Sequence, residues 1–161
     1  TNREVLDPDA ELAIRVEVPE TEEGDPKTII IKDSGIGMTR DELIQNLGTI
    51  AQSGARDFLQ KLKEVKDSDP SDVIGQFGVG FYSVFMIAEE VKVVSRSYKL
   101  GAEAAAWISD GSNTYSIEEA EKEDRGTEIH ITLKKDAEEF ASGWRLKQIV
   151  KKHSDFVRYA I

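Results

Sequence analysis

The stretch TIIIKDSGIGMTRDEL, from Thr28 to Leu43, contains three signals that set the order of the fold. Its β-branched run from Thr28 to Lys32 is typical of a strand. Thr39 and Glu42 have the spacing of a capping box, in which a hydroxyl and a carboxylate satisfy free amides where a helix begins. Glycines lie between these two signals. The stretch therefore predicts a strand, a glycine turn and a helix, in that order.

The residues before this stretch predict a partner for its strand. Apolar side chains at Leu12, Ile14, Val16 and Val18 alternate with other residue types, which is the period of a strand with one buried face. The turn signal Gly24-Asp25-Pro26 follows. We therefore expect a β-hairpin over residues 12–32.

The helix that begins after Thr39 has an apolar side formed by Leu43, Ile44 and Leu47. Gly48 is placed to end it in a left-handed conformation. Further helices are expected at residues 58–65, as an amphipathic surface helix, and at residues 79–88, as an apolar helix buried at the centre of the fold. The polar residues 66–72 predict a mobile loop between them.

The remaining chain predicts a meander of strands and a helical end. The expected strands are Val91–Tyr98, Ala104–Ile108, Asn113–Ile117 and Gly126–Leu133, with Asp110-Gly111 as a hairpin turn. In the last strand Thr127, Ile129, Ile131 and Leu133 share one face. The closing helical segment offers Phe140, Trp144, Ile149, Val150 and Phe156 as cover. We expect a single α+β domain over residues 1–161: a two-layer sandwich with a largely antiparallel sheet and helices on one face.

Composition excludes several classes of function. The 161 residues carry a formal net charge of -10 and no cysteine, which rules out disulfides and thiolate metal sites. Basic residues form no long stripe, and no apolar run approaches the ~20 residues that span a bilayer, so neither nucleic acid nor membrane is an expected partner. We interpret His130 and His153 as structural. An anionic ligand that approaches so acidic a chain favours an accompanying divalent cation such as magnesium.

Asp33-Ser34-Gly35-Ile36-Gly37-Met38 is the first candidate for a binding site, because it follows a strand and precedes a helix. The carboxylate of Asp33 can accept a hydrogen bond from an exocyclic amine such as that of adenine, and the glycines let a flat ring approach the backbone. The alternative is a plain turn, since an acidic residue before glycines is common in turns.

The segment from Gly75 to Phe81, GQFGVGF, is the second candidate. Its glycines can expose backbone N–H groups at a helix N-terminus, where phosphate oxygens are stabilised. The spacing GxxGxG differs from both the dinucleotide-binding GxGxxG and the P-loop. The alternative is that the glycines only allow close packing of a helix on a sheet.

The residues between these motifs have the features of a lid. Glycines at 48, 54, 75 and 78 can absorb backbone rotation while residues 48–80 move over a ligand. An ordinary connection containing one short helix remains the alternative.

Four motifs, DSGIGM, NLGTIAQSG, IGQFGVGFYS and DRGTEI, closely resemble the heat-shock protein 90 chaperones, above all their bacterial and mitochondrial members. SRS at Ser95–Ser97 and WISDG at Trp107–Gly111 extend the resemblance. The resemblance implies the Bergerat-type ATP-binding fold that these chaperones share with DNA gyrase B, MutL and sensor histidine kinases. It also implies ATP or ADP with Mg²⁺ as cofactor.

Carried over by motif, the resemblance makes Asp33 the adenine-reading carboxylate, supported by Thr127, with Gly37 and Met38 lining the base pocket and Asn46 on the sugar side. Backbone amides from Gly78 to Phe81 would hold the phosphates. Nucleotide contacts are further implied for the remaining motif residues Leu47, Ser53, Gly54, Gly75, Gln76, Phe77, Val79 and Gly80. Gln52 stands where many relatives have a lysine, so we expect weaker nucleotide affinity.

In this family a helix before the first hairpin carries the catalytic glutamate and a magnesium-binding asparagine, which we expect upstream of Thr1. We therefore expect an N-terminally truncated domain with no identifiable metal ligand, little or no hydrolysis, weak nucleotide binding, and exposed apolar surface that favours dimers or swapped segments. Glu42, the nearest candidate base in sequence, is better explained as a helix cap.

The resemblance implies a stress-response chaperone in whose intact form ATPase activity, homodimer rearrangement and the binding of unfolded client proteins are coupled. The expected compartment is the cytoplasm, or alternatively the mitochondrial matrix. Two other functions remain open: the ATPase domain of a DNA topoisomerase or mismatch-repair protein, and a binding module without turnover.

Overall fold

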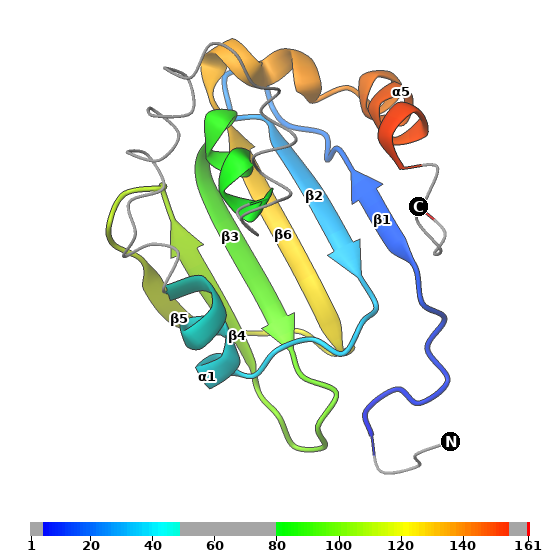
Figure 1. The fold of residues 1–161 in the computed structure, drawn as a ribbon. Helices are drawn as coiled ribbons and strands as arrows, with labels where there is room; N and C mark the ends of the chain where they lie inside the picture. Colours follow the sequence, from blue (N-terminus) through cyan, green and yellow to red (C-terminus); the bar gives the residue numbers. More distant parts are fainter. Residues whose placement is uncertain (1–4, 49–79, 155–160) are drawn as a thin grey trace, which may run out of the picture.

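Six strands form one antiparallel sheet in the order β1-β2-β6-β3-β4-β5 (Figure 1). The computed structural model describes residues 5–48, 80–154 and 161. The strands are β1 (Ile14–Glu17), β2 (Thr28–Asp33), β3 (Ala88–Arg96), β4 (Ala104–Ser109), β5 (Ser116–Ala120) and β6 (Gly126–Leu133). The helices are α1 (Arg40–Leu43), the π-helix η1 (Ile44–Gly48), the 3₁₀ helices η2 (Gly80–Met86) and η3 (Lys135–Phe140), and α5 (Gly143–His153).

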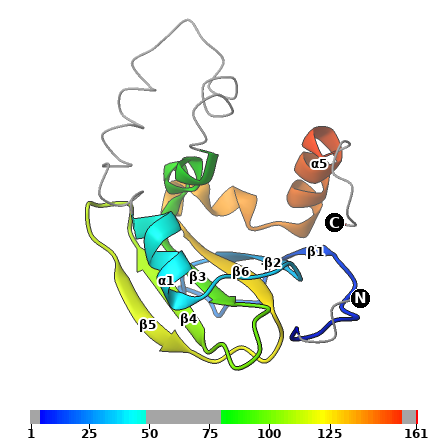
Figure 2. The ribbon, with the colours of Figure 1, turned by 60° about the horizontal axis from the view of Figure 1, so that its bottom comes forward.

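The described helices lie on one side of the sheet, as Figure 2 shows with the sheet seen near its edge. The hairpin expected over residues 12–32 is confirmed by the antiparallel pairing of β1 with β2. The predicted α+β class, with a largely antiparallel sheet and helices on one face, is confirmed as well. No helix in the described parts of the chain is both long and apolar enough to cross a bilayer.

The core lies between the sheet and the helices. Alternation in β6 places Thr127, Ile129, Ile131 and Leu133 on this inner face, as the sequence predicted. One row of side chains crosses the whole sheet in register, consisting of Val16, Ile31, Ile129, Val93, Trp107 and Ile117. Tyr82 and Phe85 of η2 and Leu43 of α1 join this core from above, so the helices are held by apolar burial.

The opposite face of the sheet carries ion pairs around β2 and β6. Lys32 Nζ lies 2.9 Å from Glu17 Oε2, and this hydrogen bond raises the pKa of Lys32. Lys122 Nζ lies 3.2 Å from Glu128 Oε1. Burial by itself would raise the pKa of Glu128, but the hydrogen bond and charge of Lys122, with Lys32 and His130 nearby, hold that pKa below its ordinary value. The face can therefore remain in contact with water.

Two strand predictions need correction. β3 begins at Ala88 and ends at Arg96, earlier than the predicted Val91–Tyr98. β5 is Ser116–Ala120, later than the predicted Asn113–Ile117, and Asp110-Gly111 is part of a longer loop than a two-residue turn. Side chains explain the loop, because Ser109 Oγ donates to the carbonyl of Thr114 at 3.1 Å and accepts from the amide of Gly111. These local bonds replace ladder bonds.

The helix predictions at residues 79–88 and at the chain end are also corrected in part. η2 is a 3₁₀ helix that ends at Met86, where the side chain is 43% exposed, whereas Tyr82 and Phe85 of the same helix are buried. In the closing segment Phe140 and Leu146 pack against the core. Trp144 is 71% exposed and gives no cover.

Gly48 does not end its helix in a left-handed conformation, because it has no positive φ. It is buried, and an added Cβ would lie 2.6 Å from the Tyr115 hydroxyl, so glycine is needed here for close packing. The helix expected at residues 58–65, the loop expected at 66–72 and nearly all of the candidate lid, 48–80, lie outside the described residues.

Candidate functional site

One row of the inner face is polar, unlike the apolar rows beside it. Asp33 on β2 pairs with Thr127 on β6, and Thr127 pairs with Ser95 on β3. Thr127 is 8% exposed and Ser95 is fully buried, and their hydroxyl oxygens lie 2.9 Å apart. Buried hydroxyls and carboxylates need hydrogen-bond partners, so this row is the part of the core that can bind a polar ligand.

The loop after Asp33 is bound tightly to the end of β3. The amide of Tyr98 donates to the carbonyl of Ile36 at 2.7 Å, and the amide of Met38 donates to Ser95 Oγ at 2.9 Å. Gly37 has a φ of +59°, and an added Cβ would lie 1.9 Å from the carbonyl oxygen of Arg96. No side chain fits there, so the glycine of the motif is required by backbone packing as well as by conformation.

Asp33 is oriented by its own loop. Its Oδ1 accepts from the amide of Gly35 at 2.8 Å, which forms an Asx turn. Among the described residues this is its side chain's one hydrogen bond, which leaves Oδ2 for a ligand. The two interpretations of the motif, a turn and a binding carboxylate, are therefore compatible.

A cavity of about 560 Å³ opens on the β1 side of Asp33. Its size is within the range of small-molecule pockets. It is lined mainly by apolar groups from β1 and the Asp33 loop, with Arg125 at one side: Leu12, Ala13, Ile14, Asp33, Ser34, Gly35, Ile36 and Arg125. Asp33 thus stands between this cavity and the hydroxyls of Thr127 and Ser95.

The other predicted site residues in the described parts of the chain lie on η1 and η2. Asn46 on η1 is exposed, and its Nδ2 lies 3.6 Å from Met38 Sδ. Leu47 beside it is buried in the core. Gly80 begins η2, and the ring of Phe81 packs edge-on against Trp107 with centroids 6.0 Å apart. The predicted contacts Ser53, Gly54, Gly75, Gln76, Phe77, Gly78 and Val79 lie outside the described residues.

Sequence reasoning did not place Ser95 in the site. The alternation of β3 contained the signal, because Val91 and Val93 are followed on the same face by Ser95 and Ser97. Two buried hydroxyls at the end of an otherwise apolar strand face indicate that this end of the strand contacts polar groups.

Glu42 was the nearest candidate base in sequence, and its contacts are those of a cap. Its Oε2 accepts from the amide of Thr39 at 2.8 Å, and its Oε1 lies 3.0 Å from Lys99 Nζ. The backbone bond to Thr39 and the bond to Lys99 lower the pKa of Glu42. A carboxylate held in its ionised form by these partners is a poor proton acceptor.

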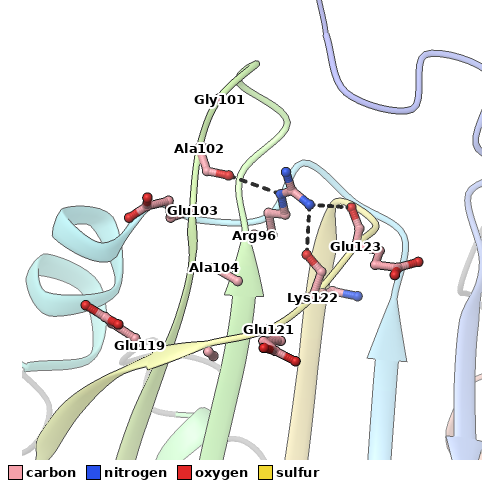
Figure 3. Close-up of a pocket in the computed structure, with 10 residues that line it drawn as sticks. Arg96, Gly101, Ala102, Glu103, Ala104, Glu119, Glu121, Lys122 and Glu123 are labelled. Carbon is pink, nitrogen blue, oxygen red and sulfur yellow. Dashed lines mark hydrogen bonds between the residues drawn. The ribbon is translucent and has the colours of Figure 1, made fainter.

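A separate pocket of about 680 Å³ lies beside Arg96 (Figure 3). The Arg96 guanidinium donates to the carbonyls of Ala102, Lys122 and Glu123 and so fastens two loops together. Four glutamates also line the pocket: Glu103, Glu119, Glu121 and Glu123. Because these carboxylates repel phosphates, this pocket does not suit a nucleotide.

Comparison with known proteins gives one consistent family. Residues 6–143 match the family model described as histidine kinase-, DNA gyrase B- and HSP90-like ATPase. The chain is 50% identical over its full length to chaperone protein HtpG of Chlorobium chlorochromatii and covers 25% of that protein. It is 46% identical to chaperone protein HtpG of Desulfitobacterium hafniense over 95% of the chain and 25% of that protein.

The chain therefore spans about a quarter of the length of the curated relatives that it matches. The resemblance to the heat-shock protein 90 chaperones that rested on four motifs is confirmed over the whole chain. The relatives compared above are bacterial Hsp90-type chaperones. The polar row, the loop bound to β3 and these matches together lead us to conclude that the chain belongs to the histidine kinase-, DNA gyrase B- and HSP90-like ATPase family.

Proposed function

We propose that this chain binds ATP and ADP through the Asp33 row, as the nucleotide-binding part of an Hsp90-type chaperone. The observation that carries the proposal is a half-buried carboxylate, oriented by Gly35 on a residue paired in register with Thr127, at the edge of an apolar cavity. An exocyclic amine is the natural partner of such a carboxylate in an apolar pocket.

Gly37 and Met38 are proposed to contact the base, which their place in the loop between Asp33 and α1 supports. Asn46 is proposed to face the sugar, which its contact with Met38 supports. The phosphates are proposed to bind the backbone of the glycine segment that leads into η2, and residues 48–80 are proposed to act as a lid. Glycine content and family membership support both proposals.

Magnesium is proposed to arrive with the nucleotide. The net charge of -10 repels a bare triphosphate, and Mg²⁺ reduces that repulsion by binding phosphate oxygens while it keeps several of its waters.

In the intact protein we propose ATP hydrolysis, assistance to folding client proteins, a homodimer and a cytoplasmic location, with no nucleic acid or membrane partner. The names of the relatives support the chaperone role, and the acidic composition disfavours a DNA-dependent ATPase. The 161 residues taken alone are proposed to bind nucleotide without turning it over, because Glu42 is engaged as a cap. Phosphate release by the isolated 161-residue polypeptide would contradict that last proposal.

The binding proposal is tested by calorimetry with Mg-ADP on Asp33→Asn in the intact protein that contains this chain. The substitution keeps the shape and removes the charge, so affinity should fall by about 10- to 100-fold, the equivalent of one charge-assisted hydrogen bond. Asp25→Asn is the matched control, since Asp25 is exposed in the connection between β1 and β2. Unchanged affinity in Asp33→Asn would overturn the proposed site.

A competition assay distinguishes the proposed chaperone function from that of a topoisomerase or mismatch-repair ATPase. An inhibitor selective for the adenine pocket of Hsp90-type chaperones should displace Mg-ADP from this protein. If only inhibitors of the gyrase type displace it, the chaperone assignment fails while nucleotide binding stands.

A further inference from the structure

Arg125, the residue before β6, carries a guanidinium with unused donors. In the part of the chain that the structure describes, its side chain makes no hydrogen bond and no ion pair, and its Nε is buried. An arginine has five N–H donors, and a buried donor without a partner costs free energy. Arg96 is the contrast, because its guanidinium donates to three backbone carbonyls (Figure 3). Unlike Arg96, Arg125 has donors that are free to bind a ligand.

The backbone holds Arg125 in a defined place. Its amide donates to Asp7 Oδ2 at 3.0 Å, and the next residue, Gly126, pairs with Arg96 of β3. A side chain that starts from a backbone fixed on both sides loses less freedom when it binds a ligand. The position of Arg125 is therefore suited to recognition.

Three cavities meet at Arg125, and one of them suits an anion. The cavity of about 500 Å³ has three aspartates in its lining, Asp7, Asp9 and Asp124. The cavity of about 310 Å³ is lined by five carboxylates, and two of its lysines are already paired. The cavity of about 560 Å³ has one carboxylate in its lining, that of Asp33. Carboxylates repel an anion at short range, so an anionic ligand is best accommodated in this third cavity.

The rest of the third cavity is apolar. Leu12 and Ile36 line it and are 47% and 67% exposed, and Ala13, Ile14 and Gly35 add further apolar surface. A ligand that covers the two exposed side chains removes them from water, which favours binding. This lining therefore suits a ligand with an apolar body, while the guanidinium suits a charged end.

The third cavity lies beside the proposed nucleotide site and is distinct from it. Among the described residues that are proposed to contact the nucleotide, Asp33 alone belongs to its lining. Met38, Asn46, Phe81 and Thr127 do not. A ligand of this cavity therefore uses another set of contacts than the nucleotide does.

We propose that Arg125 and the cavity on the β1 side of Asp33 bind a monocarboxylate with an apolar body, such as an acyl or aryl carboxylate. A planar guanidinium forms two parallel hydrogen bonds with a carboxylate. One negative charge fits better than the two of a phosphate monoester, because Asp33 and Asp124 line cavities that meet at Arg125. The site goes beyond the proposed nucleotide function and does not rest on it.

Octanoate is the probe, and calorimetry on the intact protein that contains this chain is the measurement. Octanoate should bind at least about tenfold more tightly than octanol, which has the same chain length without the charge, because octanol makes no charge-assisted hydrogen bond. Octyl phosphate should bind more weakly than octanoate. The proposal is overturned if octanoate does not bind, if octanol binds equally well, or if octyl phosphate binds more tightly.

Arg125→Gln should lower the affinity for octanoate by about 10- to 100-fold, since the hydrogen bonds to the carboxylate are lost together with the charge. Arg15→Gln is the matched control. Arg15 is an exposed arginine of β1 that lines the neighbouring 310 Å³ cavity and not this one, so octanoate affinity should stay at the wild-type value. Equal losses in the two variants would mean that octanoate responds only to the overall charge.

Leu12→Gln gives a second test at an exposed position, where the substitution leaves the core intact. It should weaken octanoate by about fivefold, because apolar contact with the acyl chain is lost. If Arg125→Gln does not fold, Leu12→Gln and the comparison with octanol decide the question, and unchanged octanoate affinity in Leu12→Gln overturns the proposed cavity.

Thermal unfolding and nucleotide binding separate this site from the proposed function. Octanoate should raise the Tm of the wild type and of Arg15→Gln but not that of Arg125→Gln, because a ligand stabilises only the protein that binds it. Mg-ADP affinity should be the same in Arg125→Gln and in the wild type. Binding of octanoate without Mg-ADP would contradict the nucleotide function alone, and binding of Mg-ADP without octanoate would contradict this inference alone.

Discussion

At the scale of single residues, glycines and hydroxyls determine the site more than its one carboxylate does. Gly37 lets the Asp33 loop approach the backbone of β3, and Gly126 does the same on β6, where an added Cβ would lie 2.1 Å from the carbonyl oxygen of Asp33. These contacts bring Asp33, Thr127 and Ser95 into one row. The position of the acidic group therefore depends on residues without side chains.

Comparison of Gly37→Ala with Gly101→Ala distinguishes the cost of a left-handed backbone conformation from the cost of a steric clash. Both glycines have positive φ, so each variant carries about 1–2 kcal/mol of left-handed strain. Only Gly37 has backbone atoms where the methyl group would lie, whereas the space around Gly101 is open. Urea unfolding should show Gly37→Ala to be less stable than Gly101→Ala by about 3 kcal/mol. Equal losses would mean that the loop moves away from β3 at little cost.

At the scale of elements, the start of α1 combines all the capping features that the sequence predicted. Thr39 Oγ1 accepts from the amide of Glu42 at 3.3 Å, and Glu42 returns a bond to the amide of Thr39. Lys99 then ties this short helix to the loop between β3 and β4. Because α1 is only one turn long, caps and packing rather than length hold it in place.

Thr39→Ala should lower the free energy of unfolding by about 1 kcal/mol, because one helix amide loses its acceptor. Urea titration measures the loss. The control is Thr21→Ala, since Thr21 is an exposed threonine in the connection between β1 and β2. A loss in the control as large as in Thr39→Ala would show that the cap contributes nothing specific.

The pH dependence of α1 follows from Glu42. Its pKa in the folded chain is below the ordinary 4.5, so its ionised form stabilises the fold above that pH. This contribution to stability is lost as the pH falls from about 4.5 through the lowered pKa of Glu42 in the folded chain. The stability difference between wild type and Glu42→Gln should therefore be constant near neutrality and shrink in acid. A difference that grows in acid would contradict the assignment.

At the scale of the whole molecule, charge opposes the ligand that the site is proposed to bind. A net charge of -10 surrounds a site whose own side chain at Asp33 is acidic. Long-range repulsion of this kind is screened by salt, with a Debye length of about 8 Å at physiological ionic strength. Nucleotide binding should therefore respond to salt in the opposite sense to that of a basic phosphate site.

Affinity for magnesium-free ATP should rise by about two- to threefold when KCl is raised from about 20 to 150 mM, because screening weakens the repulsion. Titration of adenosine, which has no charge, is the control and should show no such change. A fall in ATP affinity with added salt would indicate basic groups at the phosphates and would contradict this expectation.

The sequence by itself determined the local features of this protein. Alternation fixed the inner face of β6, the hairpin of β1 and β2 followed from its turn signals, and the Thr39–Glu42 box fixed where α1 begins. These succeeded because each depends on neighbours in sequence. The motifs also identified the family, which the match of residues 6–143 to its model confirms.

Only the tertiary structure decided features that depend on distant parts of the chain. Gly48 packs against the distant Tyr115, and Gly37 packs against the backbone of the distant Arg96. The physical reason is the same in each case. A buried contact between residues far apart in sequence leaves no periodic or local pattern from which it can be predicted.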